Sequence, residues 1–235
     1  MALPQLNTTP KYQLKIPSTG KTVKYRPFLV KEQKVLLIAY ESQDRRAIVQ
    51  SMLDTISSCV EDVNLTKLTT FDVDYIFTQV RAKSVGEMVE LNMTCTECET
   101  NNEVKVNLEE VQMNVEKRDM AVQITDQISV KLKYPDYNFF IRNPKILNSE
   151  SQADVLVDII ISCIESVQTD EENINIADEP REEVERFIES LTSSQFEKIS
   201  EFVKDLPKLT HEAKFTCANC KHENTRTLEG LEDFF

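Results

Sequence analysis

The sequence has only three glycines, no tryptophan and no excess of basic residues, and these shortages exclude several classes of function. Three scattered glycines cannot build the glycine-rich phosphate loops of nucleotide-binding proteins. The 235 residues include 27 lysines and arginines against 40 acidic residues, a net charge of −13. A negative net charge disfavours general electrostatic binding to nucleic-acid phosphates or to an anionic membrane surface. The composition therefore argues against a nucleotide-driven enzyme, a general nucleic-acid binder and a membrane-surface protein.

Long hydrophobic runs are also missing. The most apolar stretch, residues 155–164, is ten residues long and contains Asp158, which is too short to cross a bilayer. The first ten residues have neither a basic start nor an apolar centre, so we expect no secretory signal. With 40% hydrophobic and 29% charged residues the chain has a globular composition,. We expect it to remain in the cytosol, with its six cysteines as thiols or metal ligands,.

The first half reads as a polar arm followed by strands and helices. Residues 1–10 are the arm, and alternating residues predict a β-hairpin from 12–16 and 21–25,. Helical spacing then runs from 31 to 60 with a break near Ser42 and Gln43. A further helix is expected with Thr70 as its N-cap and Gly86 at its end. Strands at 88–93 and 103–108 flank the first Cys-x-x-Cys pair.

The second half repeats this order. Strands are expected at 121–124 and 128–133, followed by a helix at 151–167 and a short helix around 187–191. Another helix runs through Phe202 and is capped by Ser194 and Glu197,. Strands at 213–216 and 225–228 then flank the second Cys-x-x-Cys pair. Residues 168–185 form an acidic insert with eight acids and one arginine. We interpret the insert as an irregular solvated loop, with a divalent-ion site as the alternative.

The two halves match at the residue level. Residues 54–63 and 158–167 are identical at six of ten positions, and the two cysteine pairs recur at an offset of 122. Matches in one order favour an internal duplication, although two coincidentally similar βα segments are the alternative. The expected fold is α+β, with two pseudo-repeated βα units at 11–116 and 117–235. Each unit would end in a strand–Cys-x-x-Cys–strand knuckle, and a zinc-ribbon-like four-cysteine site would join them.

The cysteine pairs are the sharpest chemical signal. Four thiolates in a tetrahedron hold zinc, and a two-residue gap places two of them at one tight turn. Cys95, Cys98, Cys217 and Cys220 are therefore the candidate ligands of one structural zinc per chain, even though 118 residues separate the pairs.

Three other interpretations of the pairs stay open. A redox role needs a helix N-terminus to depress one thiol pKa, whereas both pairs here follow strands. Each pair could instead bind its own metal, but only the second has flanking histidines, His211 and His222. An ancestral site that no longer binds metal is the third.

Three features outside the pairs have simple interpretations. His211 and His222 are expected to be surface groups, or neighbours of the metal ligands, and not catalysts. Cys59 and Cys163 occupy matched positions on apolar helix faces, where a free cysteine is usually a small buried hydrophobe,. The terminal Phe234 and Phe235 either pack onto the core or anchor a partner.

Several segments resemble the T4-type phage baseplate proteins, a family of baseplate hub subunits and hub assembly factors of contractile-tailed phages. They are Pro27–Glu32, Asp74–Glu87, the two Cys-x-x-Cys pairs and the Asp-Phe-Phe end. The similarity covers about residues 14–235, and its most specific part is Arg81–Gly86 followed by a Cys-x-x-Cys pair. The resemblance implies a late viral protein of baseplate hub assembly without enzymatic activity.

The predicted function follows from the composition and cysteine pattern together with the family resemblance. We expect a structural or chaperone-like protein that contacts other baseplate hub and tail proteins, in the host cytoplasm during assembly and, if retained, in the virion. A closed four-thiolate site leaves no open position for catalysis, so no catalytic residue and no small-molecule substrate are expected. The alternative is a zinc-ribbon regulator that binds nucleic acid in late viral transcription, which the acidic charge disfavours.

Overall fold

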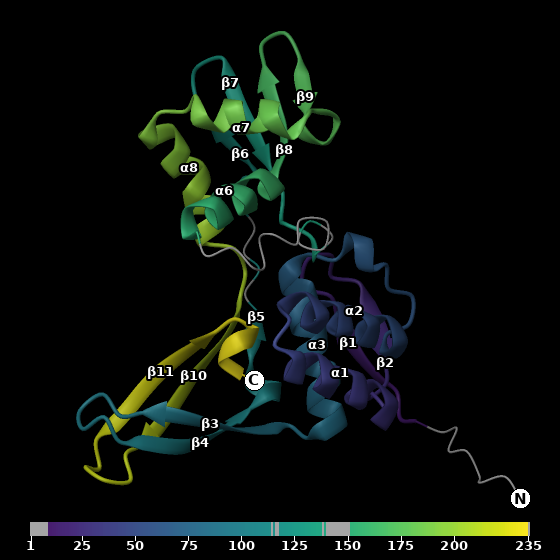
Figure 1. Ribbon diagram of the computed structural model, residues 1–235, viewed down its shortest axis with the longest axis vertical. Coiled ribbons are helices and arrows are strands. Elements are labelled where there is room, and N and C mark those ends of the chain that lie inside the picture. The colour runs from purple at the N-terminus through teal and green to yellow at the C-terminus, as the bar shows by residue number, and fades with distance from the viewer. Residues whose placement is uncertain (1–8, 114, 116–117, 138, 140–150, 235) are drawn as a thin grey trace, which may run out of the picture. The chain divides into compact units, whose positions relative to one another are not determined.

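The structure, a computed structural model, describes residues 9–113, 115, 118–137, 139 and 151–234 (Figure 1). Most of the expected arm, residues 1–8, lies outside this range. The chain forms two compact units. The first unit combines the described residues of Met1–Val115 with those of Pro207–Phe235, and the second consists of the described residues of Glu116–Leu206. Helices and sheets are mixed in both, as the α+β prediction requires.

The first unit begins with the predicted hairpin and a set of helices. Strands β1 (Tyr12–Lys15) and β2 (Thr22–Tyr25) pair antiparallel. Helices α1 (Val30–Ser42), α2 (Arg45–Cys59) and α3 (Thr70–Val85) follow. The expected break after Ser42 is confirmed, because Gln43 adopts a left-handed conformation with φ of 56°. Asp44 then caps α2 by accepting a hydrogen bond from the Arg46 N–H,.

Helix α3 begins one residue earlier than the sequence suggested. The N-cap is Thr69 rather than Thr70, and Asp72 completes a capping box with it,. The Asp72 carboxylate is fully buried and also accepts hydrogen bonds from the backbone N–H and hydroxyl of Ser18. That one carboxylate therefore ties the β1–β2 turn to the start of α3. Gly86 ends the helix as predicted.

The rest of the first unit consists of two long hairpins. Strand β3 (Met88–Thr94) pairs with β4 (Asn101–Asn107), and β10 (Leu209–Thr216) pairs with β11 (Glu223–Glu229). Strand β5 (Gln112–Met113) joins β10 at its base. The hairpins share a buried core with the C-terminal 3-10 helix η4 (Leu231–Phe234). The core residues are Ala82, Val89, Met93, Val104, Val106, Leu108, Val111, Leu209, Ala213, Leu228 and Phe234. Phe234 is fully buried, so this terminal aromatic packs onto the core, while Phe235 lies outside the described residues.

In its described residues, the second unit contains a four-stranded antiparallel sheet and three α-helices. The strands run in the order β6 (Ala121–Gln123), β7 (Ile128–Leu132), β8 (Ile164–Thr169) and β9 (Asn173–Asn175). Helices α6 (Gln152–Cys163), α7 (Arg181–Glu189) and α8 (Ser193–Lys204) complete it. Its core is formed by Ile124, Val130, Leu132, Ile160, Cys163, Ile164, Val167, Val184, Ile188, Ile199 and Phe202.

Three predictions in this unit were wrong. The helix expected at 151–167 ends at Cys163, and Ile164–Thr169 forms β8 because it pairs with β7. The acidic insert 168–185 is not an irregular loop, since it contains the end of β8, strand β9 and the first turn of α7. The capping box of α8 is formed by Thr192 and Gln195, not by Ser194 and Glu197.

The division into units also differs from the predicted domains at 11–116 and 117–235. The second knuckle, carried by β10 and β11, belongs to the first unit. The physical reason is that β10 pairs with β5 and that Leu209, Ala213 and Leu228 lie in the first unit's core. Both cysteine pairs therefore lie in one unit.

One arrangement occurs in each unit. The N–H of Arg26, just after β2, donates to the carbonyl oxygen of Cys59, the last residue of α2, at 3.0 Å. The N–H of Lys133, just after β7, donates to the carbonyl oxygen of Cys163, the last residue of α6, at 2.7 Å. Both cysteine side chains are buried. In both units, therefore, a hairpin is followed along the chain by a helix whose last residue accepts a backbone hydrogen bond from the residue just after the hairpin.

Candidate metal centre

The two cysteine pairs lie in turns of the same design. In the first turn the Cys95 N–H donates to the Thr100 carbonyl oxygen, and in the second the Cys217 N–H donates to that of His222, both at 2.9 Å. A residue with positive φ closes each turn, Glu99 at 56° and Lys221 at 65°. All of these positions are 122 residues apart, the offset of the cysteines themselves. The turns point successive sulfurs to one side, as a metal-binding knuckle requires.

The structure brings the four predicted ligands together. All four sulfur atoms lie within 4.8 Å of one another. The Sγ atoms of Cys95 and Cys220 are 3.7 Å apart, and those of Cys98 and Cys217 are 3.6 Å apart. Four sulfurs about 2.3 Å from a tetrahedral zinc ion would be about 3.8 Å from one another. The sulfur positions therefore fit a four-coordinate zinc ion.

Two asparagine side chains link the two knuckles by hydrogen bonds. The Asn102 side chain, on β4, accepts a hydrogen bond from the Ala218 N–H at 2.8 Å and points its amide nitrogen at the Cys217 sulfur, 3.7 Å away. The Asn224 side chain, on β11, accepts from the Thr96 N–H at 3.0 Å and points its nitrogen at the Cys95 sulfur, 3.5 Å away. Both asparagines are buried. Each one therefore holds the opposite turn and donates to a sulfur of the opposite pair.

These asparagines were not predicted from the sequence, although their spacing from the cysteines is the same in both knuckles. Each lies four residues after the second cysteine of its own pair, so both knuckles read Cys-x-x-Cys-x-x-x-Asn. The spacing alone does not reveal that each amide acts across the interface as well as within its own turn, where it donates to the carbonyl oxygen of Thr100 or His222. That information depends on how the two hairpins pack.

Local hydrogen bonds shift the acidity of the thiols. The hydroxyl and N–H of Thr100 lower the pKa of Cys98 to about 6. Burial raises the pKa of Cys95, but the N–H groups of Cys98 and Glu97 outweigh burial and lower it overall. The His222 N–H lowers the pKa of Cys220, yet the neighbouring Cys98 sulfur and burial raise it to about 12. A divalent cation between the sulfurs would favour their ionised form and offset the repulsion between thiolates.

The histidines do not join this cluster. Among the described residues, the group of close ligand atoms consists of the four cysteines and includes neither His211 nor His222. The alternative of one metal per pair therefore lacks the side chains that it needs. Cys59 and Cys163 lie elsewhere, and burial raises the pKa of each thiol to about 11.

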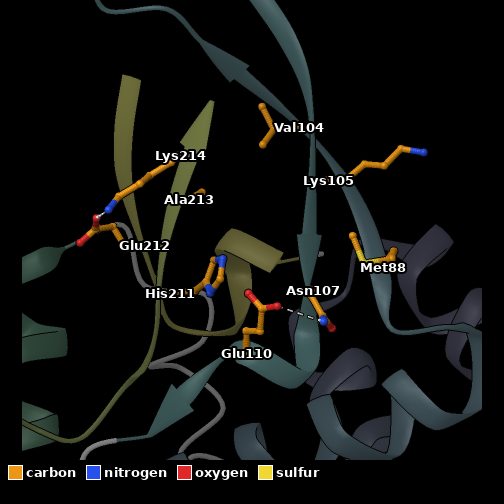
Figure 2. Close-up of a pocket in the computed structure, with 9 residues that line it drawn as sticks. All are labelled: Met88, Val104, Lys105, Asn107, Glu110, His211, Glu212, Ala213 and Lys214. Atoms are coloured by element: carbon orange, nitrogen blue, oxygen red, sulfur yellow. Dashed lines mark hydrogen bonds and ion pairs between the residues drawn. The ribbon is translucent and has the colours of Figure 1, made fainter. Parts of the chain in front are cut away.

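His211 instead lines a groove between β4 and β10 (Figure 2). Glu110, beside His211 in Figure 2, accepts a hydrogen bond from the Asn107 amide at 3.3 Å. On the β10 side Lys214 pairs with Glu212 at 2.8 Å. Charged and polar groups make up most of the lining, and the half-buried His211 lies at the side of this groove, away from the cysteine cluster.

The comparison with known protein families covers nearly the entire chain. The family described as T4 bacteriophage base plate protein matches residues 9–235. The chain belongs to this family. It is also 23% identical over 225 residues to the baseplate hub assembly protein gp26 of Enterobacteria phage T4, covering 96% of this chain and 98% of that protein. No solved structure gives a significant match.

The four-cysteine cluster therefore lies in a protein of the phage baseplate family, in agreement with the resemblance seen in the sequence. No helix in the described part of the chain is both long and apolar enough to cross a membrane.

Proposed function

We propose that the chain is a non-enzymatic structural or chaperone-like protein of baseplate hub assembly, acting through contacts with other hub and tail proteins. The observation that supports this most directly is the full-length similarity to a baseplate hub assembly protein. Similarity that spans both chains from end to end covers both units and both knuckles, not one shared module. The protein would act in the host cytoplasm while the baseplate is built.

In this proposal, Cys95, Cys98, Cys217 and Cys220 hold one structural zinc ion. The sulfur–sulfur distances of 3.6 and 3.7 Å support zinc, as do the donor amides of the two asparagines. Four thiolates fill the coordination sphere, so the ion would act as a cross-link between the two hairpins. The hairpins are separated by more than a hundred residues, and the ion would fix the surfaces that they present to partners.

The internal duplication is part of the same proposal. The matched turns at an offset of 122 and the matched carbonyl contacts of Cys59 and Cys163 support it. An ancestral unit would have paired with a second copy through its knuckle, and the four-cysteine site would preserve that pairing within one chain.

The metal is tested by elemental analysis of the purified full chain. We expect one zinc per chain, lost in the Cys95→Ser, Cys98→Ser variant and retained in Cys59→Ala, which removes a thiol outside the cluster. No metal, or two ions per chain, would overturn the zinc assignment.

The function is tested in a phage that lacks the gene. Such a phage should produce heads and tail fibres but no complete baseplates by electron microscopy, and the wild-type gene should restore them. Normal baseplates and tails in the mutant would refute the assignment. Mass spectrometry of purified particles then separates a resident hub protein, present at fixed stoichiometry, from an assembly factor that leaves. Binding of the pure protein to a specific promoter would instead support the regulator.

A further inference from the structure

Helix α1 exposes an unusual amount of apolar surface. Eight large hydrophobic side chains are exposed in the described part of the chain, and six of them lie between positions 29 and 40. They are Leu29, Val30, Val35, Leu37, Ile38 and Tyr40, from 40% to 79% exposed. Only Glu32 and Ala39 of α1 are buried. A helix that is apolar on most sides is normally covered by other protein.

The outward stripe of α1 has a defined pattern. Positions 30, 34, 37, 38 and 41 share one helix face by their three-and-four spacing, opposite the buried Glu32 and Ala39,. This stripe therefore carries Val30, Leu37 and Ile38, with Lys34 and Glu41 placed between and beside them. Within the described part of the chain neither Lys34 nor Glu41 takes part in an ion pair.

The exposed charges on α1 are arranged against its own dipole, whereas the buried Glu32 in the first turn is favourably placed,. Exposed Lys31 and Lys34 lie near the N-terminus and Glu41 lies in the last turn, whereas a helix favours the opposite order,. Glu32, the acid of the first turn, pairs with Arg26 and Lys31 and accepts a hydrogen bond from the Leu29 N–H. In an antiparallel pair of these helices, the lysines near the N-terminus of each helix would lie beside Glu41 and the C-terminal carbonyl groups of the other. Both the lysines and Glu41 would then have favourable electrostatic partners.

We propose that α1 is the self-association surface of this protein, pairing antiparallel with α1 of a second copy about a two-fold axis near Leu37 and Ile38. In that register Leu37 faces the partner subunit's Ile38, and Lys34 faces the partner subunit's Glu41. A two-fold contact of this kind is self-complementary, so every favourable pair occurs twice. This inference goes beyond the zinc site and the baseplate assignment, and neither is needed for it.

The local charge permits this contact on an otherwise acidic chain. Near the stripe, four exposed cations, Lys31, Lys34, Arg45 and Arg46, outnumber the two exposed acids, Glu41 and Asp44. Two copies at −13 each would repel through most of their surfaces,. Here the cations of one copy would meet the acids of the other. A single helix pair with this support falls at the small end of specific interfaces, so we expect micromolar affinity.

Sedimentation velocity on the full chain, over about 1–100 µM, tests the proposal. We expect a concentration-dependent dimer and at least a tenfold higher dissociation constant for Leu37→Glu. Met88→Glu is the matched control, because Met88 is similarly exposed but lies on β3. Circular dichroism checks that both variants fold.

A charge exchange tests the antiparallel register of the two helices. Lys34→Glu and Glu41→Lys should each weaken the dimer, because each places like charges across the axis, and the double variant should restore it. A chain that is monomeric at every concentration, a dimer indifferent to Leu37→Glu, or a double variant no better than the singles would each overturn the proposal. Protection of α1 from hydrogen exchange in a monomer would assign the face to another occupant. Zinc content and the baseplate phenotype do not change with any of these outcomes.

Discussion

At the scale of single residues, Asn102 and Asn224 decide how well the cysteines are placed. Each amide accepts from a backbone N–H of the opposite turn and donates toward a sulfur of that turn's pair. Donors to ligand sulfurs orient the ligands and stabilise their ionised form. Each amide nitrogen also donates to a carbonyl oxygen of its own turn, Thr100 for Asn102 and His222 for Asn224. A change in the donor that keeps the acceptor therefore tests these donor contacts apart from the acceptor contact.

We expect Asn102→Asp to weaken zinc binding about ten- to a hundredfold, because the carboxylate still accepts from Ala218 but offers no donor to the Cys217 sulfur or to the Thr100 carbonyl oxygen,. Competition with a coloured chelator measures the affinity. Asn101→Asp is the control, since it adds the same charge on the neighbouring exposed residue, whose side chain bonds Thr94 instead of a sulfur. Equal losses in both variants would attribute the effect to charge and not to the lost donor.

Thiol reactivity should separate the six cysteines into two classes. Burial raises the pKa of Cys59 and Cys163 to about 11, so their thiolates are scarce at pH 8 and hard to reach,. The four cluster cysteines should be protected by zinc and become reactive when a chelator removes it. Peptide mapping after timed alkylation of the native protein reads both effects. Rapid labelling of Cys163 before any cluster cysteine in the chelated protein would contradict this.

At the scale of elements, the start of α1 depends on a buried ion pair. Glu32 is 8% exposed, and it accepts hydrogen bonds from Arg26 at 3.0 Å and from the Leu29 N–H at 2.8 Å. Burial raises the pKa of this carboxyl, but the hydrogen bonds to Arg26 and Leu29 outweigh burial and lower it overall. The folded pKa is thus below the unfolded value of about 4.3. Glu32 stabilises the fold above that value, and the contribution disappears as pH falls through the folded pKa.

We expect Glu32→Gln to lower the free energy of unfolding by about 1–3 kcal/mol at pH 7, because it leaves Arg26 without its charged partner. The difference from wild type should shrink below about pH 4, where the wild-type carboxyl is also neutral. Urea titrations at several pH values measure it. Glu189→Gln, at the exposed end of α7, is the control and should change little. A difference that stays constant down to pH 3 would show that charge is not the cause.

Local patterns predicted most elements but not their ends. The break after Ser42, the end of α3 at Gly86 and both knuckle hairpins follow from turn residues and alternation, which act locally. The helix expected through Val167 failed because Ile164 and Val167 fit a helix or a strand equally well, and pairing with β7 decides between them. The α8 cap shifted from Ser194 to Thr192 for a related reason, since Ser and Thr at either position have suitable partners three residues later.

At the scale of the whole molecule, the sequence identified the four cysteines that the fold brings together but placed the second knuckle in the wrong unit. Cysteine spacing identifies ligands because the chemistry of zinc demands it. The grouping of β10 and β11 with the first unit depends on pairing between Leu209 and Met113 and on shared burial, which link positions almost a hundred residues apart. No local pattern encodes that partnership, and a simple duplication model predicts the opposite.

The location of both knuckles in the first unit leads to the last prediction. Zinc would cross-link β3–β4 to β10–β11 inside that unit, while the core of the second unit contains none of the ligands. A ligand at a thousand times its dissociation constant stabilises its binding unit by about 4 kcal/mol. For a unit of this size, that corresponds to a change in melting temperature of about 10 °C.

Chelation should therefore destabilise one unit and spare the other. Hydrogen exchange by mass spectrometry should show faster exchange in β3, β4, β10 and β11, with little change in β7, β8 and α8. Calorimetry should show one transition moving down by about 10 °C while a second stays in place. The Cys95→Ser, Cys98→Ser variant should reproduce the chelated pattern without added chelator, which excludes a direct effect of the chelator. Equal loss of protection across both units would mean that they unfold as one cooperative body, so that the metal supports the whole chain.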